Sequence, residues 1–249
     1  MTIPTLTTGA PLTMLAMSHH LNTALEKSND ALVDVSEAHH EVLMRLAIAA
    51  EYRDDYTGQH IIRLGYMAEK LSALLGESDE FCHMIRLAAP MHDVGNIGIP
   101  EAVLKNPGKL STQERLMMNT HTDIGYKILA NSSAPLFQLA ATIALTHHEK
   151  FDGTGYPQQL AGDAIPLAGR IVALVDYFDA LTTDKRHRAA FSDAQAIEMV
   201  LAQSGKHFDP EMVAVFIANI AYFIQLRLSI NANPLEYGPL VNYSLASFM

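Results

Sequence analysis

HDVGNIGIP at residues 92–100 and HHEKFDGTGYP at residues 147–157 are the stretches that decide the fold. Each stretch directly follows an apolar run without strand-like alternation, so each begins at the end of a predicted helix. Imidazoles clustered with carboxylates are the ligands from which proteins build transition-metal sites. The two stretches therefore predict a helical protein that holds metal ligands at the ends of buried helices.

The remaining candidate ligands lie on other predicted helices. His60 stands early in the apolar run that ends before Gly76, His121 lies within another helix, and Asp176 belongs to the apolar run 171–181. Helical bundles form metal sites in their cores from side chains on facing helices. Any one of these histidines is more often an ordinary core or surface residue, and it is the whole set that favours a metal centre. The seven candidate ligands are His60, His92, Asp93, His121, His147, His148 and Asp176.

The composition of this set indicates the metal and the reaction. Five imidazoles and two carboxylates suit iron, manganese, zinc, cobalt or nickel, and they offer too few oxygens for a calcium site. A carboxylate beside a histidine, as in His92-Asp93, can bridge two cations. Two metals about 3.5–4 Å apart activate a shared water and hold the attacking and leaving oxygens of a phosphodiester. The set predicts a two-metal hydrolase without a protein nucleophile.

Stop and cap residues predict helices through most of the chain, and alternating strand patterns are almost absent. Glycine stops helices, while Ser, Asp and Pro start them. A Ser followed three residues later by Glu or Gln makes a capping box. The signals are Gly76 after the run 61–75, Ser78 before a helix that runs into His92, Ser111 with Glu114 before the helix that carries His121, Ser192 with Gln195 before a helix that ends near Gly205, and Asp209 with Pro210 before a last long helix.

The segment 149–167 is the exception, because its glycines and prolines do not allow a regular helix. A loop of this length inside a compact domain is usually functional. It directly follows His147 and His148, so we expect a structured wall of the active site. The Gly155-Tyr156-Pro157 turn is interpreted either as a contact for a nucleotide or a partner domain, or as a rigid turn whose tyrosine only packs.

The two opening stretches resemble the HD block and the GYP block of the HD-GYP phosphodiesterases. Four shorter segments are similar as well: YTGQH at 56–60, PGKL at 107–110, RIVALVD at 170–176 with DALT at 179–182, and FDP at 208–210. The resemblance covers about residues 48–220. A single His-Asp pair is common by chance, but two long blocks at this separation are very specific.

This resemblance implies an all-α helical bundle of the HD superfamily with a structured GYP loop. It implies hydrolysis of cyclic di-GMP to linear pGpG, sometimes onward to GMP, at a bi- or trinuclear centre that often contains iron or manganese. The seven candidate ligands would be the metal ligands, with Asp93 as the bridge, and His92 and Asp93 would lie at the catalytic centre. Asp179, one helical turn beyond Asp176, would support a ligand, and its alternative is a plain surface carboxylate. The expected substrate contacts are Asn96, Lys109, Tyr156, Lys185 and Arg188.

Three positions depart from the family pattern. Some members place a Glu that supports a third metal where this chain has Tyr56, and a phenol with a pKa near 10 is a poor substitute. A two-metal centre is therefore predicted. Asn96 stands where the family usually has a Lys suited to a substrate phosphate, so we expect lowered activity or an altered substrate. Lys185 and Arg188 keep positive charge where relatives carry basic residues, and their alternative is a solvated face.

Overall composition limits the partners and the compartment. The formal net charge of -10 disfavours binding of DNA or RNA polymers, which requires a basic face. Cys82 is the only cysteine, which excludes an internal disulfide and suits a reducing compartment. We find no signal-peptide pattern, and the apolar stretch 212–228 is interrupted by polar residues and is interpreted as a buried helix. The expected location is the cytoplasm, without membrane insertion.

The predicted organisation places one catalytic domain after a helical stalk. Residues 1–16 are interpreted as a mobile leader, 17–47 as a stalk or dimerisation region, 48–220 as the HD-GYP domain, and 221–249 as a helix end with a tail. The apolar positions in 21–46 follow a heptad spacing. This seam indicates either a homodimer or a helix that packs on its own domain.

Three functions remain open from the sequence. The first is a phosphodiesterase acting on cyclic di-GMP. The second is a catalytically weak nucleotide-binding signalling module, in which substitutions such as Asn96 have removed turnover. The third is a hydrolase of a different cyclic dinucleotide, such as cyclic GMP-AMP, because the base pockets cannot be located from the sequence.

Overall fold

The computed structural model describes residues 41–51, 53, 58–184 and 188–232, together with Thr23 and Lys27. Residues 1–42 and 43–249 form two separate compact units, and the second unit carries the candidate ligands. Most of the predicted heptad seam lies outside the described residues. Tyr56 and Lys185 lie outside them as well.

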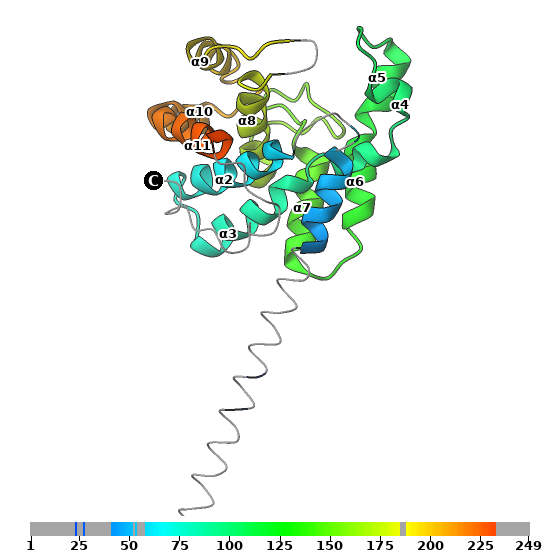
Figure 1. Ribbon diagram of the computed structural model, residues 1–249, viewed down its shortest axis with the longest axis horizontal. Helices are drawn as coiled ribbons and strands as arrows, with labels where there is room; N and C mark the ends of the chain where they lie inside the picture. The colour runs from blue at the N-terminus through cyan, green and yellow to red at the C-terminus, as the bar shows by residue number, and fades with distance from the viewer. Residues whose placement is uncertain are drawn as a thin grey trace, which may run out of the picture. The chain divides into compact units, whose positions relative to one another are not determined.

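The centre of the second unit is a set of packed helices, which confirms the predicted all-α class. Figure 1 shows α2 between α3 and α8, and α7 contacts α3, α6 and α8. The largest fully buried side chains include Tyr66, Phe178, Phe216 and Phe223. These central helices are α2 (Gln59–Leu74), α3 (Asp79–Ala88), α6 (His121–Leu129), α7 (Pro135–Thr146) and α8 (Leu167–Leu181).

Shorter helices connect and cover this core. Residues 43–51 are helical and precede α2. No named strand occurs among the described residues, which contain only two isolated β-bridges. The other elements are the 3-10 helices η1 (Ala89–Met91), η2 (Val94–Gly98) and η3 (Gly162–Ala164), with α4 (Glu101–Leu104), α5 (Thr112–Asn119), α9 (Asp193–Ala202), α10 (Pro210–Ala218) and α11 (Ile220–Ala232).

The predicted caps are confirmed by their hydrogen bonds. The Ser78 hydroxyl accepts from the backbone N–H of Phe81, and the Asp209 carboxylate accepts from the N–H of Glu211. Both predicted capping boxes are complete, at Ser111 and at Ser192. These side chains satisfy backbone donors that the first turn of a helix leaves without partners.

Two predicted helices are wrong in extent, because each ends before it reaches its histidine. The helix opened by Ser111 ends at Asn119, and His121 starts α6 instead. Both the N–H and the hydroxyl of Thr120 donate to the carbonyl of Met117, at 3.1 and 2.7 Å, which closes a tight turn. The helix that approaches His92 likewise ends at Ala88, and η1 completes the connection. His92 and His121 therefore stand at helix junctions rather than within long helices.

The predicted last long helix is also divided. The amide of Asn219 donates to the carbonyl of Val215 at 2.9 Å, and α10 and α11 meet there at 67°. Within the described residues, no individual helix combines the length and apolarity of a membrane span, although this bent pair meets those criteria when counted together. Phe216 and Phe223 are buried in the core, as expected for a helix of the protein interior.

The segment 149–167 is irregular apart from η3, as predicted, and it is tightly held. The buried carboxylate of Glu149 accepts from the N–H of Gln158 at 2.7 Å and of Leu160 at 3.0 Å. A Cβ at Gly155 would lie 2.3 Å from the backbone nitrogen of Lys150, so only glycine fits there. The loop that follows His148 is therefore an ordered segment, held by specific hydrogen bonds and close packing.

Candidate metal centre

The seven candidate ligands converge from five parts of the fold. His60 is the second residue of α2, His92 and Asp93 connect η1 to η2, and His121 begins α6. His147 and His148 follow α7, and Asp176 lies in α8. Ligand atoms of Asp93, His121, His147 and His148 lie within 4.8 Å of one another, as do those of His60, His92 and Asp176. We call these sets the four-ligand group and the three-ligand group.

The four-ligand group is arranged around one oxygen of Asp93. Its Oδ1 lies 3.3 Å from Nε2 of His121 and 3.4 Å from Nε2 of His147, and these two nitrogens are 3.5 Å apart. The ring of His148 lies beside that of His147, with centroids 4.1 Å apart. Ligand atoms that bind a common metal at about 2.1 Å lie roughly 3.0–3.5 Å apart in octahedral or tetrahedral geometry. The measured spacing fits a metal ion.

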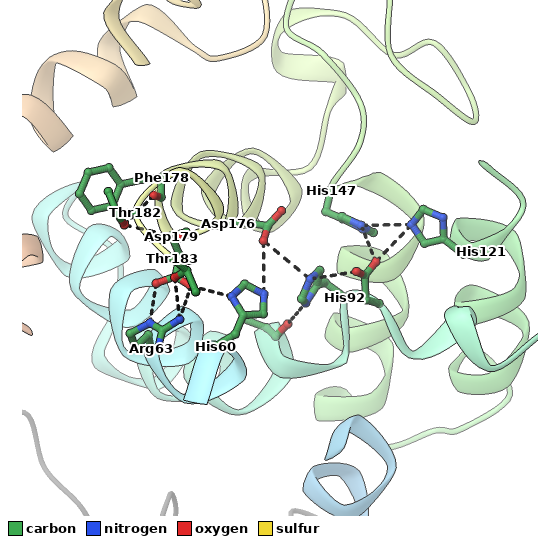
Figure 2. Close-up of polar contacts among 12 residues, drawn as sticks. His60, Arg63, His92, His121, His147, Asp176, Phe178, Asp179, Thr182 and Thr183 are labelled. Carbon is green, nitrogen blue, oxygen red and sulfur yellow. Dashed lines mark hydrogen bonds and ion pairs between the residues drawn. The ribbon is translucent and has the colours of Figure 1, made fainter. Parts of the chain in front are cut away.

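The three-ligand group is arranged around Asp176 and the other oxygen of Asp93. Oδ1 of Asp176 lies 3.4 Å from Nε2 of His60 and 4.0 Å from Nε2 of His92. The same nitrogen of His92 is 3.6 Å from Oδ2 of Asp93. The two oxygens of Asp93 thus face different histidine groups, which is the geometry of a carboxylate that bridges two sites. Figure 2 shows His60 on one side of this arrangement and His121 with His147 on the other.

Backbone carbonyls hold three of the imidazoles in the orientation that a ligand needs. Nδ1 of His92 lies 3.1 Å from the carbonyl of Ala89, and Nδ1 of His121 lies 2.7 Å from that of Met118. Nδ1 of His147 lies 3.1 Å from the carbonyls of Ile143 and Ala144. A carbonyl only accepts hydrogen bonds, so each Nδ1 carries the proton and each Nε2 keeps its lone pair for a metal.

His60 is held by a buried ion pair instead. Its Nδ1 lies 2.7 Å from Oδ2 of Asp179, and Arg63 donates to both oxygens of that carboxylate at 2.6 and 2.8 Å (Figure 2). Although burial opposes ionisation, Arg63 and His60 hold the pKa of Asp179 well below its usual range. Burial also opposes protonation of His60, but the hydrogen bond and charge of Asp179 raise its pKa to about 9. Asp179 therefore holds the ring of His60 in one orientation.

The electrostatics of the other ligands favour the protonation states that bind metals. Burial lowers the pKa of His92 to about 4, and it lowers the pKa of His148 well below the usual value. Burial alone would raise the pKa of Asp93, but His92, His121 and His147 hold it well below its ordinary value. Neutral imidazoles and ionised carboxylates are the required ligand forms. The donor set thus fits divalent transition-metal ions.

The predicted substrate contacts fall in different surroundings. Asn96 is buried and lines the same pocket as His60, His92 and Asp93. The ring of Tyr156 stacks on His148, with centroids 4.8 Å apart, so the GYP turn lies against the four-ligand group.

Two further predicted contacts are described and lie elsewhere. Lys109 is exposed in the connection between α4 and α5, and it does not line that pocket. Arg188 donates to the carbonyl of Ala180 at 2.6 Å, and its guanidinium lies over the ring of Phe191.

Several residues around the centre were not found from the sequence. Arg63 lies one turn after His60 on α2, and that spacing was the available signal for its role. Glu149 directly follows His148, but its buried backbone contacts carry no sequence signature. Glu51 also lines the pocket, and Arg53 donates to carbonyls of the HD block. Both precede the block at 56–60 and matched no motif.

A helical fold with a buried histidine–aspartate cluster at its helix junctions defines the class of this protein, and the comparison with known families agrees. The chain belongs to the HD domain family, whose match extends over residues 20–212. The predicted relationship to HD-GYP phosphodiesterases is confirmed at the level of named relatives.

Three relatives illustrate the similarity. The chain is 42% identical over 199 residues to the 3′3′-cGAMP-specific phosphodiesterase 2 of Vibrio cholerae serotype O1, covering 80% of this chain and 38% of that protein. It is 42% identical over 193 residues to the cyclic di-GMP phosphodiesterase response regulator RpfG of Xanthomonas campestris pv. campestris, covering 78% and 51%. It is 42% identical over 177 residues to a cyclic di-GMP phosphodiesterase of Thermotoga maritima, covering 71% and 48%. The chain thus spans about half or less of the length of these relatives.

A solved structure shares the fold. It is a crystal structure of a cyclic GMP-AMP-specific phosphodiesterase from V. cholerae, with a TM-score of 0.56 and 20% sequence identity. The alignment covers 84% of this chain and 54% of that chain. This similarity supports the helical architecture alone.

Proposed function

We propose that this protein is a metal-dependent phosphodiesterase that hydrolyses cyclic di-GMP to linear pGpG. The observation that carries the proposal is the position of Asp93, whose two oxygens face two separate histidine groups. Two sites that share one carboxylate suit the attack of water on a phosphodiester. The names of the relatives from Xanthomonas and Thermotoga support the choice of substrate.

Two divalent transition metals, iron or manganese in our proposal, would occupy the four-ligand and three-ligand groups. When bound, they supply charge neutralisation for the phosphate and acidify a water molecule. The residues of the chain fix the geometry of that chemistry. Asp93 joins the two groups, backbone carbonyls orient three imidazoles, and Asp179 orients His60. The oxygen of water forms a bond to phosphorus and the bond from phosphorus to the ribose O3′ breaks. One proton of the water ends on O3′, and the other is released as the new phosphate group ionises.

The loop 149–167 would form the wall that faces the nucleotide. Tyr156 stacks on His148, and Glu149 fixes the backbone of the loop. An aromatic ring at this position can contact a base or ribose when the phosphate lies at the metals. Asn96 lines the pocket beneath and offers an amide rather than a cation. In our proposal, charge for the phosphate comes mainly from the metals.

A second substrate, cyclic GMP-AMP, is favoured by one specific observation. The relative that is 42% identical over 199 residues is named as specific for 3′3′-cGAMP. Both substrates contain the same phosphodiester linkages, so the metal centre serves either. Discrimination between cyclic di-GMP and cyclic GMP-AMP would depend on contacts with the bases.

The wider setting that we propose is bacterial nucleotide signalling in the cytoplasm. The single cysteine, Cys82, is buried and free, in agreement with a reducing compartment. A homodimer through residues 21–46 is part of the proposal, and its test is the mass of the full chain in solution.

The experiment is a product assay joined to metal analysis on one sample of the full chain. The protein is loaded anaerobically with Fe(II) or Mn(II), and separately with Zn(II), Co(II) or Ni(II), and mixed with cyclic di-GMP or 3′3′-cGAMP. Linear dinucleotide, detected by chromatography, is the expected product. Absence of product with every metal would overturn the proposal. Nucleotide binding without turnover would instead identify a signalling module.

A further inference from the structure

Glu51 places a carboxylate against the metal centre without a partner for one of its oxygens. It is the last described residue of the helical stretch that precedes α2, and it exposes 8% of its surface. Its Oε2 is buried and has no hydrogen-bond partner among the residues that the structure describes. The side chain lines the pocket that also contains His60, His92 and Asp176. Buried carboxylates are costly unless a cation or a hydrogen-bond donor compensates them, so this oxygen indicates that the pocket binds a ligand.

Asn96, which belongs to the HD block, also has a buried oxygen without a hydrogen-bond partner among the described residues. It exposes 2% of its surface, and its Oδ1 is buried without a described hydrogen-bond partner. It lines the same pocket as Glu51. Two acceptors that come from different segments and meet no donor point to a ligand that donates hydrogen bonds. A ligand that only accepts, such as a bare phosphate oxygen, does not satisfy them.

Arg53 attaches the segment of Glu51 to the HD block. Its guanidinium donates to the carbonyl of Asn96 at 3.0 Å and to that of Ile99 at 2.8 Å, and it also contacts the carbonyl of Ile97. Three carbonyls at the end of η2 are thereby satisfied by one side chain. The hydrogen bonds of Arg53 thus fix the segment that carries Glu51 against the HD block.

The surroundings of Glu51 indicate which ligand group it serves. All three members of the three-ligand group, His60, His92 and Asp176, line the pocket beside Glu51, whereas His121 and His147 of the other group do not line it. Glu51 itself lies outside both described sets of atoms within 4.8 Å of one another, so it is beside the ligands rather than among them.

Both groups leave coordination positions to water. Oδ2 of Asp93 joins His60, His92 and Asp176, so with the bridge each group offers four protein ligands. Transition metals such as manganese and iron commonly take more ligands than four, and water fills the remaining positions. Water bound to a cation is a strong hydrogen-bond donor, which matches what Glu51 and Asn96 lack.

We propose that Glu51 and Asn96 are positioning residues that accept hydrogen bonds from the water ligands of the ion held by His60, His92 and Asp176. This inference rests on the proposed metal centre and deepens it. Glu51 adds a negative charge that strengthens binding of that ion, while Asn96 adds only an acceptor. Neither residue acts on the four-ligand group.

The test is a metal titration of the full chain by calorimetry, after removal of metals with a chelator. Wild-type protein is expected to bind two equivalents of Mn(II). Glu51→Gln should weaken one equivalent about ten- to a hundredfold and leave the other unchanged, because partners of the ligands contribute at that scale. Glu51→Asp, which keeps the charge, should restore part of the loss. Asn96→Leu should weaken the same equivalent by roughly threefold to tenfold.

Glu69→Gln is the matched control, because Glu69 is a half-buried acid on α2 that pairs with Arg86 away from the pocket. It should bind both equivalents as the wild type does. Equal binding by Glu51→Gln and wild type, or equal weakening of both equivalents, would overturn this inference while the proposed function stands. Failure of the wild type to bind any metal would contradict the proposed function itself. If Glu51→Gln does not fold, Asn96→Leu decides by the same criterion.

Discussion

The two ligand groups of the centre differ in the contact that supports one histidine. His121 and His147 in the four-ligand group, like His92 in the three-ligand group, are oriented by backbone carbonyls three or four residues earlier in the chain. His60 in the three-ligand group is oriented by Asp179, which is itself held by Arg63. The carbonyl contacts follow from the path of the backbone. The support of His60 depends on three side chains that lie on two helices. The carbonyl contacts tolerate substitution of neighbouring side chains, while the orientation of His60 depends on its neighbouring side chains.

This contrast has an energetic consequence. A carbonyl close in sequence to its histidine is present whenever the helix forms. The buried Arg63–Asp179 pair, in contrast, is favourable only while both charges are present, because removal of one leaves the other buried and unpaired. We expect the three-ligand group to be the more fragile half of the centre. Substitutions that affect one group, or both, test this view.

The largest effect is expected from Asp93→Asn, which changes the residue that joins both groups. One amide oxygen remains as a potential ligand, but the bridge and its charge are lost. Turnover should fall roughly a thousandfold or more, because in the proposed reaction both metals act on the same phosphodiester. Metal content measured by mass spectrometry should fall below two equivalents. Full activity of Asp93→Asn would contradict the shared role of this carboxylate.

Asp179→Asn should damage only the three-ligand group and the stability of the fold. Arg63 would remain buried without its counter-ion, which costs about 3–5 kcal/mol of unfolding free energy. Affinity for one metal should fall about ten- to a hundredfold. Urea unfolding and metal titration measure the two effects separately.

Asp163→Asn is the control for this change. Asp163 pairs with Arg170 at 2.7 Å, but its side chain is 91% exposed. Exposed ion pairs contribute about 0–1 kcal/mol, so little change is expected. Equal losses in the two variants would show that burial does not distinguish these pairs.

The four-ligand and three-ligand sets were predictable because their residues carry motif and composition signals. His92, Asp93, His147 and His148 stand in long recognisable blocks, and the capping residues fix the helix starts around them. The sequence did not predict that helices break before His92 and His121. Before His121 the hydroxyl of Thr120 bonds to a carbonyl and competes with helix continuation, and before His92 Pro90 lacks the N–H that would extend α3.

The supporting contacts were harder to predict because they join distant segments. Arg63 meets Asp179 across more than a hundred residues of sequence, and Arg53 meets the carbonyls of the HD block. Such pairs leave no periodic pattern, and one sequence contains many arginines and acids that pair differently. Asp179 was proposed through the family resemblance, with its one-turn spacing from Asp176 as support, and Glu51 was not found at all.

Tyr156→Ala is expected to affect the four-ligand side alone, with a moderate effect. It removes the ring that stacks on His148 and leaves the three-ligand group unchanged. We expect KM for the dinucleotide to rise about threefold to tenfold, since an aromatic contact contributes about 0.5–1.5 kcal/mol. Tyr156→Phe keeps the ring and should behave like the wild type. An unchanged KM in both variants would favour a tyrosine that only packs.

His207, a histidine outside both groups, provides a baseline for the acid sensitivity of the fold, apart from the metal ligands. Burial lowers the pKa of His207 to about 4, and its ring stacks on Phe208. In the unfolded chain its pKa is about 6.5, so the unfolded state binds more protons between pH 6.5 and 4. Stability is therefore lost as the pH falls through this range, and His207 accounts for about 1–3 kcal/mol of that loss. His207→Phe keeps an aromatic ring and should reduce the loss by this amount in urea unfolding at matched metal saturation. A constant difference between variant and wild type from pH 7 to 4.5 would mean that the acid sensitivity arises from the metal ligands instead.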